Sequence, residues 1–282
     1  MPEKQIRRIS EWDAKEFYHQ LGTQYRTHDM KQIEQFLVGC AGQLEGEQKN
    51  PVLCCMVYNE MGSFYRGTSR YQESLVAFQK SQELILELKG RNTAEYAASV
   101  NNMAGTCRLM GAFEQAVSLF QEALNIHEML GDLQSYAYAS VHNNLSLVYQ
   151  ETGRLDLAVI HLETALPLIE NMPEHGHELA VTETNLGILY HRMGKTWKAQ
   201  MCIGRALQIF EGLDDEKNVH YAAALNMLGT FHYESGQYEK AADAYEKAAK
   251  YTERFFGKNK EYETACRNLS RVRVKLGKEP VI

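Results

Sequence analysis

The 282-residue sequence predicts an all-α fold, a right-handed superhelical solenoid of stacked antiparallel helix pairs. The main observation is a sequence motif that recurs at a nearly fixed interval, which we call the pitch. Its central position holds Ser69, Gly111, Gly153, Gly194, Gly236 and Gly277, in steps of 42, 42, 41, 42 and 41 residues. Such a pitch is typical of stacked copies of one structural unit and not of a single globular core. Positions in each copy are counted from this central residue, which we call the turn position.

The residues before the turn position predict the first helix of each copy. Position −8 is apolar in all six copies, position −4 is bulky, and position −7 between them is always small. Spacing by three and four residues marks one face of a helix. A small side chain there lets two helices approach closely. The small residues at position −7 are Gly62, Ala104, Ser146, Gly187, Gly229 and Ser270.

The residues after the turn position predict a second helix. Position +5 is small, position +9 is bulky and position +12 is small, as in Ala116, Phe120 and Ala123. A glycine between two helical patterns favours the end of one helix and a reversal of the chain. Neither helix can bury its apolar stripe alone, so the pairs are expected to stack on one another.

The repeat divides the chain into three parts of one continuous solenoid. Residues 50–260 are expected to form five helix pairs, and residues 261–282 a lone C-terminal capping helix and tail. Residues 1–49 fit less well. Leu21, Gly22 and Tyr25 echo the first-helix pattern, but no glycine or alanine column follows. We interpret this segment as degenerate N-terminal capping helices, because terminal repeats must cover an exposed apolar face.

The repeated motif resembles the tetratricopeptide repeat (TPR). The resemblance lies in strings such as Asn102-Met103-Ala104 followed by Gly111 and Ala116, and it covers about residues 50–277. A pitch near 42, longer than the family's commoner 34, and the doubled asparagines at 101–102 and 143–144 resemble the kinesin light chain subgroup. The resemblance implies a TPR array that binds segments of other proteins.

Composition narrows the function classes. A net charge of −6 gives no reason to expect nucleic-acid binding. The N-terminal residues are charged and lack the apolar core of a signal peptide, and no run of apolar residues is long enough to cross a membrane. Six cysteines without disulfide or zinc spacing favour a reducing cytoplasm. No phosphate-binding glycine loop or nucleophile elbow is present, so we expect neither an enzyme nor a bound cofactor or metal.

Asparagine recurs at two neighbouring positions of the first helix. It is a mediocre helix former, so its repetition calls for a compensating role. The TPR resemblance implies that these positions line the concave groove, where a carboxamide could bond both backbone groups of an extended guest peptide. The alternative is structural, with asparagines of adjacent helices bonding one another. The candidates are Asn59, Asn101, Asn143 and Asn226 at position −10 and Asn102, Asn144, Asn185 and Asn268 at position −9.

The residues one and two turns further along the first helices make this strip basic in an otherwise acidic chain. They predict a partner with an extended, acidic segment. Glu60, Glu151 and Glu234 oppose this, so the preference should be local. The candidate contacts are Arg66, Arg108, Arg192, Arg271 and Lys275, together with Tyr233, whose position should face the groove.

Two hypotheses of function follow. The first is an adaptor that holds an acidic segment of a partner protein in the groove. The second is a cytoplasmic peptide sensor whose superhelix changes shape on binding, which scattering with and without ligand would reveal. Homo-oligomer formation stays open, because apolar residues lie near the end of the chain: Val272, Val274, Leu276, Val281 and Ile282.

Overall fold

A computed structural model describes residues 9–45, 50–213 and 218–280 of the chain. Within these ranges the regular structure is helical, which confirms the predicted all-α class. Short 3-10 turns lie at Ile9–Glu11 and Pro173–His175. The helices are α1 (Ala14–Tyr25), α2 (Met30–Glu45), α3 (Pro51–Gly67), α4 (Tyr71–Lys89), α5 (Ala94–Leu109), α6 (Phe113–Leu130), α7 (Tyr136–Glu151), α8 (Leu155–Glu170), α9 (Gly176–Arg192), α10 (Thr196–Gly212), α11 (Val219–Glu234), α12 (Tyr238–Phe256) and α13 (Lys260–Lys275).

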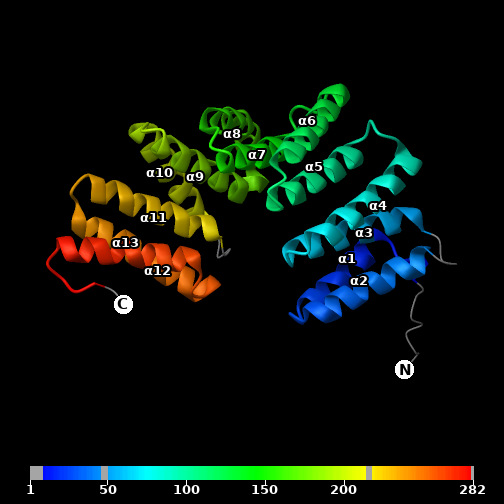
Figure 1. The fold of residues 1–282 in the computed structure, drawn as a ribbon, viewed down its shortest axis with the longest axis horizontal. Helices are drawn as coiled ribbons and strands as arrows, with labels where there is room; N and C mark the ends of the chain where they lie inside the picture. The colour runs from blue at the N-terminus through cyan, green and yellow to red at the C-terminus, as the bar shows by residue number, and fades with distance from the viewer. Residues whose placement is uncertain (1–8, 46–49, 214–217, 281–282) are drawn as a thin grey trace. The chain divides into compact units, whose positions relative to one another are not determined.

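The chain divides into two compact units, Met1–Leu133 and Gln134–Ile282. Unit 1 contains α1 to α6 and unit 2 contains α7 to α13 (Figure 1). Within each unit, consecutive helices form antiparallel pairs, such as α3 with α4 and α9 with α10, and α13 packs on α12. The predicted helix pairs are therefore present. That all of them form one continuous superhelix stays a prediction.

The turn positions adopt the left-handed backbone conformation. Their φ angles run from +62° at Ser69 to +78° at Gly111. The turn is closed by a bond from the residue after it to the carbonyl oxygen at position −4; Arg154 N, for example, donates to Tyr149 O at 2.8 Å. Glycine adopts this conformation without a steric penalty, which explains the glycine column. Ser69 adopts it at a cost of about 1–2 kcal/mol.

The N-terminal helices follow the same plan as the repeats. His28, which lies 41 residues before Ser69, has a φ of +56° and separates α1 from α2. Ile33 and Leu37 then occupy positions +5 and +9 and are fully buried. The sequence did not show this copy, because its turn position is a histidine and its position −7 is Leu21. The segment thus keeps the repeat's turn and buried positions without its glycine and alanine residues.

The small residues at position −7 mark the closest approach of the two helices of a pair. A Cβ atom added to Gly187 would stand 2.7 Å from Cγ1 of Ile203, the residue at position +9 of the same pair. A Cβ on Gly229 would meet the ring of Tyr245 at the same distance. Contacts this short do not occur, so the bulky +9 side chain takes the space that the small residue leaves.

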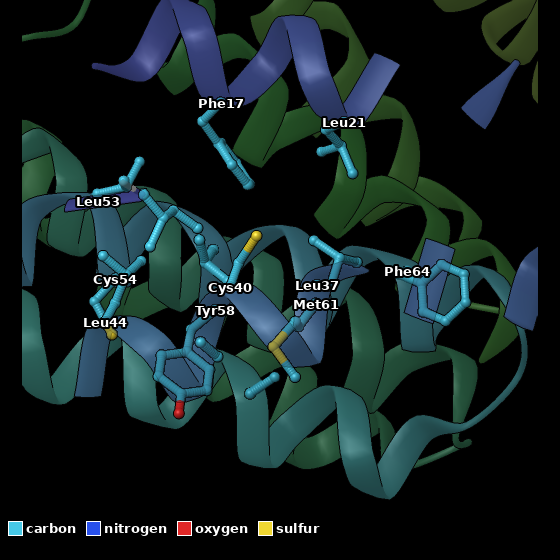
Figure 2. Close-up of a cluster of buried hydrophobic side chains, with 14 of the residues drawn as sticks. Phe17, Leu21, Leu37, Cys40, Leu44, Leu53, Cys54, Tyr58, Met61 and Phe64 are labelled. Carbon is cyan, nitrogen blue, oxygen red and sulfur yellow. The ribbon is translucent and has the colours of Figure 1, made fainter. Parts of the chain in front are cut away.

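The core of unit 1 joins α1 and α2 to the pair formed by α3 and α4. Figure 2 shows Phe17 and Leu21 directed from α1 toward side chains of α2 and α3. Phe17 is completely buried and stacks on Phe36 with ring centroids 6.4 Å apart. This packing covers the apolar face of the α3–α4 pair, which is the role of a terminal pair in a repeat array.

A cation stacked on a tyrosine closes several of the turns. Arg70 lies 4.5 Å from the Tyr65 ring centroid, and Arg154 lies 4.9 Å from that of Tyr149. In both copies the tyrosine is at position −4 and the arginine directly follows the turn position. Such contacts contribute about 0.5–1 kcal/mol at exposed sites.

The end of the chain offers less apolar surface than its sequence suggested. Val272 is fully buried, whereas Val274 is 61% exposed. Val281 and Ile282 lie outside the described residues. Among the helices described, none combines the length and the apolar character that crossing a membrane requires.

We predict that Gly187→Ala destabilises the protein by up to about 2 kcal/mol. The added Cβ overlaps Ile203, which costs about 1–3 kcal/mol, and helix propensity recovers about 1 kcal/mol of this. Gly204→Ala in α10 is the matched control. No atom lies within 4 Å of its added Cβ, so this substitution should be neutral or stabilising. Urea denaturation measures both changes. Equal effects of the two substitutions would contradict the close-approach argument.

A buried histidine pair joins α7 to α8. Nδ1 of His142 and Nδ1 of His161 are 2.8 Å apart, and the rings of Tyr138 and Tyr149 pack against them. Burial, and then the charge of His161, lower the pKa of His142 to about 4. Burial also lowers the pKa of His161. Both rings are therefore neutral at pH 7.

Unit 2 should lose stability as the pH falls from about 6.5 to about 4. A histidine whose pKa is lowered by folding takes up a proton more readily in the unfolded chain, so protonation favours unfolding in this window. For His142 the loss between pH 7 and pH 5 is roughly 1–2 kcal/mol. Denaturation at both pH values measures it. In His142→Leu most of this loss should disappear; an unchanged loss would assign the pH dependence to other groups.

Candidate functional site

The eight candidate asparagines lie on the first helices of the pairs. In unit 1 these helices are α1, α3 and α5, and in unit 2 they are α7, α9, α11 and α13. We call the surface that they share within each unit the first-helix face. All eight asparagine side chains are half-buried. They are thus neither part of the core nor fully solvated, as expected for a polar strip along a shallow surface.

Asparagines of neighbouring first helices are hydrogen-bonded to each other. Asn102 Nδ2 donates to Asn59 Oδ1 at 3.0 Å, between α5 and α3. Asn268 Nδ2 donates to Asn226 Oδ1 at 3.1 Å, between α13 and α11. In both cases position −9 of one copy reaches back to position −10 of the preceding copy. The alternative structural role of these asparagines is therefore present at two steps of the stack.

The other steps vary this bond in a consistent way. Asn143 Nδ2 donates to Thr182 Oγ1 of α9 at 3.1 Å. Thr184 replaces asparagine at position −10, bonds its own helix at Ala180 O, and is followed in the next copy by Met227 at position −9. Where one partner of the bond is missing, the other is missing too. Asn101 and Asn144 also have interaction partners.

The bonds between first helices do not use all the capacity of the asparagines. A carboxamide offers two donor hydrogens and an acceptor oxygen, and each bond described occupies one of these groups. Asn185 of α9 makes no hydrogen bond to another described residue, although its side chain is half-buried. Packing between helices therefore explains the presence of Asn185 less well than that of the other asparagines.

Arg66 is the most constrained basic residue of the first-helix face. Its Nη1 donates to the backbone oxygen of Asn102 at 3.2 Å, and its guanidinium lies 5.5 Å from the Phe78 ring centroid. Gly105 leaves room for it, because a Cβ there would stand 3.3 Å from Nη1. Burial, and then the charge of Arg108, lower the pKa of Arg66. No carboxylate among the described residues pairs with Arg66.

The basic residues of unit 2 are more open. The guanidinium of Arg271 lies 5.6 Å from the ring centroid of Tyr233, which joins α13 to α11. Tyr233 is half-buried and also packs against Tyr238, so only part of its ring is accessible. Arg192 and Lys275 are exposed. The structure thus brings Arg271 of α13 and Tyr233 of α11 together.

One of the opposing acids is hydrogen-bonded within unit 2. Glu234 accepts from Nε2 of His191 at 3.0 Å, between α11 and α9. Glu60 in unit 1 has a different environment. Its Oε1 accepts from the hydroxyl of Tyr18 in α1 at 3.3 Å, and burial raises its pKa above the usual range.

Two site residues of α1 were missed by the sequence reasoning. With His28 as the turn position, Tyr18 and Tyr25 occupy positions −10 and −3, both of which belong to the first-helix face in the other copies. Counting back 41 residues from Ser69 would have found them. The missing signal was the glycine that marks most of the other turns.

The comparisons with known proteins match this geometry. The family model described as tetratricopeptide repeat matches residues 53–129 and 137–212, and a second model of the same description matches residues 222–255. Together these ranges cover more than half of the chain.

Among curated proteins, the chain is 24% identical to Protein KINESIN LIGHT CHAIN-RELATED 3 of Arabidopsis thaliana over 193 residues, which are 68% of this chain and 30% of that protein. The chain thus spans about a third of the length of this relative. Among solved structures it is similar to BtubC (BKLC) from P. vanneervenii, with a TM-score of 0.61 and 24% identity, covering 70% of this chain and 80% of that one.

A further similar structure is the apo form of the quorum sensor NprR from B. thuringiensis, with a TM-score of 0.66 and 15% identity over 93% of this chain and 71% of that one. At these identities the likeness to both structures shows the fold. The pitch, the left-handed turns, the close approach at position −7 and the family match agree. The chain belongs to the tetratricopeptide repeat family, and its repeats resemble those of kinesin light chain-related proteins.

Proposed function

We propose that the chain acts as a cytoplasmic adaptor, with no catalytic role of its own, that binds an extended acidic segment of a partner protein on its first-helix face. The observation that carries this proposal is the environment of Arg66. Its guanidinium is partly withdrawn from water, lies close to Arg108, and has no carboxylate partner among the described residues. A carboxylate from outside would relieve this cost through charge-assisted hydrogen bonds.

The asparagines have a defined part in this proposal. Bonds such as Asn59 to Asn102 fix neighbouring first helices at a constant spacing, with about 8–10 Å between packed helix axes. An extended peptide rises about 3.3 Å per residue, so one step of the stack corresponds to about three peptide residues. The remaining amide groups would then meet the peptide backbone once per step, and the arginines would select its acidic side chains.

A peptide-sensing receptor is the second candidate. It is favoured by the fold that the chain shares with the quorum sensor NprR over most of its length. The two candidates differ in the response to a bound peptide. A sensor changes its dimensions in solution, which small-angle scattering detects, whereas an adaptor keeps them.

The adaptor proposal predicts which peptides the protein selects. From a displayed library of random ten-residue peptides, the full chain should enrich sequences with Asp or Glu at a fixed position. Synthetic versions of these peptides should bind Arg66→Gln about 10- to 150-fold more weakly, because one charge-assisted hydrogen bond is worth about 1.5–3 kcal/mol. Calorimetry measures the affinities.

Arg91→Gln is the matched control for this experiment. Arg91 pairs with Glu122 away from the first-helix face, so its loss should leave peptide affinity unchanged. Selected peptides without acidic residues, or peptides that bind Arg66→Gln as well as the wild type, would refute the proposal.

Two asparagine substitutions separate packing from peptide binding. Asn102→Ala breaks the bond to Asn59, so the stability should fall by about 1 kcal/mol and the Tm by about 2–4 °C. The Asn185 side chain makes no hydrogen bond to a described residue, so in Asn185→Ala the Tm should hold while the affinity for the peptides that bind the first-helix face of unit 2 falls. Thermal denaturation and calorimetry give the two values. If Asn185→Ala binds the peptides normally, the asparagines serve packing alone.

A further inference from the structure

We propose that α1 and α3 form a second, oppositely charged subsite on the first-helix face of unit 1, in which Tyr18, Tyr25 and Glu60 hold the cationic side chain of a lysine or arginine from the partner segment. This inference rests on the proposed function, because it assumes that the face binds a peptide. It adds a requirement on the partner: the segment must also contain a basic residue, which a purely acidic segment lacks.

The two tyrosines bracket an open space on α1. They are seven residues apart and therefore lie on the same helix face, about 10.5 Å apart along the axis. Tyr18 is 47% and Tyr25 40% exposed, which is unusual for two aromatic side chains on one face of a helix. Gly22 lies between them, and no atom stands within 4 Å of the place where its Cβ would be. The backbone at Gly22 is therefore open between the two tyrosine positions, and we take this space as the slot for the cation of the ligand.

Glu60 supplies a negative charge to this slot. It accepts from the Tyr18 hydroxyl at 3.3 Å, and Asn59 also hydrogen-bonds its carboxylate. The charge of Glu60 helps to raise the pKa values of both tyrosines, so it acts on Tyr25 as well as on Tyr18. Among the described residues no lysine or arginine pairs with Glu60. A half-buried carboxylate beside aromatic side chains attracts a cation through both its charge and the faces of the rings.

A purely structural role explains only part of this arrangement. The bond from Tyr18 to Glu60 joins positions −10 and −9 of neighbouring copies, as Asn59 and Asn102 do one step later. It therefore helps to hold α1 on α3. That role does not need a charged residue, because an asparagine makes the equivalent bond at the next step. It also does not need the exposed ring of Tyr25. It also leaves Gly22 unexplained, since glycine in a helix costs about 0.5–1 kcal/mol relative to alanine.

The position of the subsite sets a spacing in the partner. Glu60 and Arg66 are six residues apart on α3, which is about 9 Å along the helix axis. An extended peptide covers this distance in about three residues. The partner segment should therefore carry its basic residue close in sequence to the acidic residue that Arg66 binds.

A small cation tests the subsite independently of any peptide. The probe is N-acetyl-arginine N-methylamide, titrated into the full chain with ¹³C-labelled tyrosine rings and followed by NMR. The signals of Tyr18 and Tyr25, assigned with single phenylalanine variants, should shift in a saturable manner. The uncharged N-acetyl-citrulline N-methylamide should not shift them. Glu60→Gln keeps the acceptor for Tyr18 but removes the charge, so the affinity for the arginine probe should fall about tenfold.

The matched control for the charge is Glu163→Gln. Glu163 also accepts from a tyrosine hydroxyl, that of Tyr190, but it lies on α8, outside the first-helix face. This variant should bind the probe as the wild type does. Equal affinity of wild type and Glu60→Gln, or the absence of ring shifts up to the solubility limit of the probe, would overturn the proposal.

Filling the slot gives a second variant that does not touch the charge. In Gly22→Leu the arginine probe should no longer shift the signals of Tyr18 and Tyr25, whereas the helix itself should become more stable. Gly42→Leu is its control, because Gly42 is an exposed glycine of α2 that also has no atom near its absent Cβ. If the probe fails while acidic peptides still bind through Arg66, the cation subsite is wrong and the adaptor proposal stands. If the probe binds but no acidic peptide is selected, the adaptor proposal fails by itself.

Discussion

The close approach of the two helices in each pair is the constraint on which the structure depends. At Gly187 and Gly229 there is no room for even one added carbon, because Ile203 and Tyr245 occupy that space. The left-handed turn must deliver the second helix to this contact in every copy, and the apolar stripes can be buried only when it does. Pitch, turn residue and the alternation of small and bulky side chains are three consequences of this single contact.

The same constraint makes the first-helix face regular. Because each pair has the same thickness, position −9 of one copy meets position −10 of the copy before it, and the bonds of Asn102 and Asn268 repeat at the same register. The structural role of the asparagines is therefore compatible with the peptide-binding role proposed for them. They fasten neighbouring first helices, and they leave amide groups along a strip where a peptide backbone could bond.

Charges on this face are placed where water is partly excluded. The guanidinium of Arg66 stacks on Phe78 and contacts the helix at Gly105. Glu60 accepts a hydrogen bond from the hydroxyl of Tyr18. The buried Glu183, by contrast, is paired with Arg205. Single charges held in a partly desolvated position carry a free-energy cost that an oppositely charged ligand removes. In the proposed function, this cost is what lets a polar face discriminate between partners.

The sequence by itself determined the helix pairs, the turn residues and the buried columns, because each of these is a local pattern repeated at one pitch. It also located most of the first-helix face, through asparagines that helix propensity does not favour. Only the tertiary structure decided which asparagines bond each other and that Arg66, Gly105 and Asn102 meet. The physical reason is that these contacts join residues about one repeat apart, and the distance between such residues depends on how the helices stack, which no local pattern records.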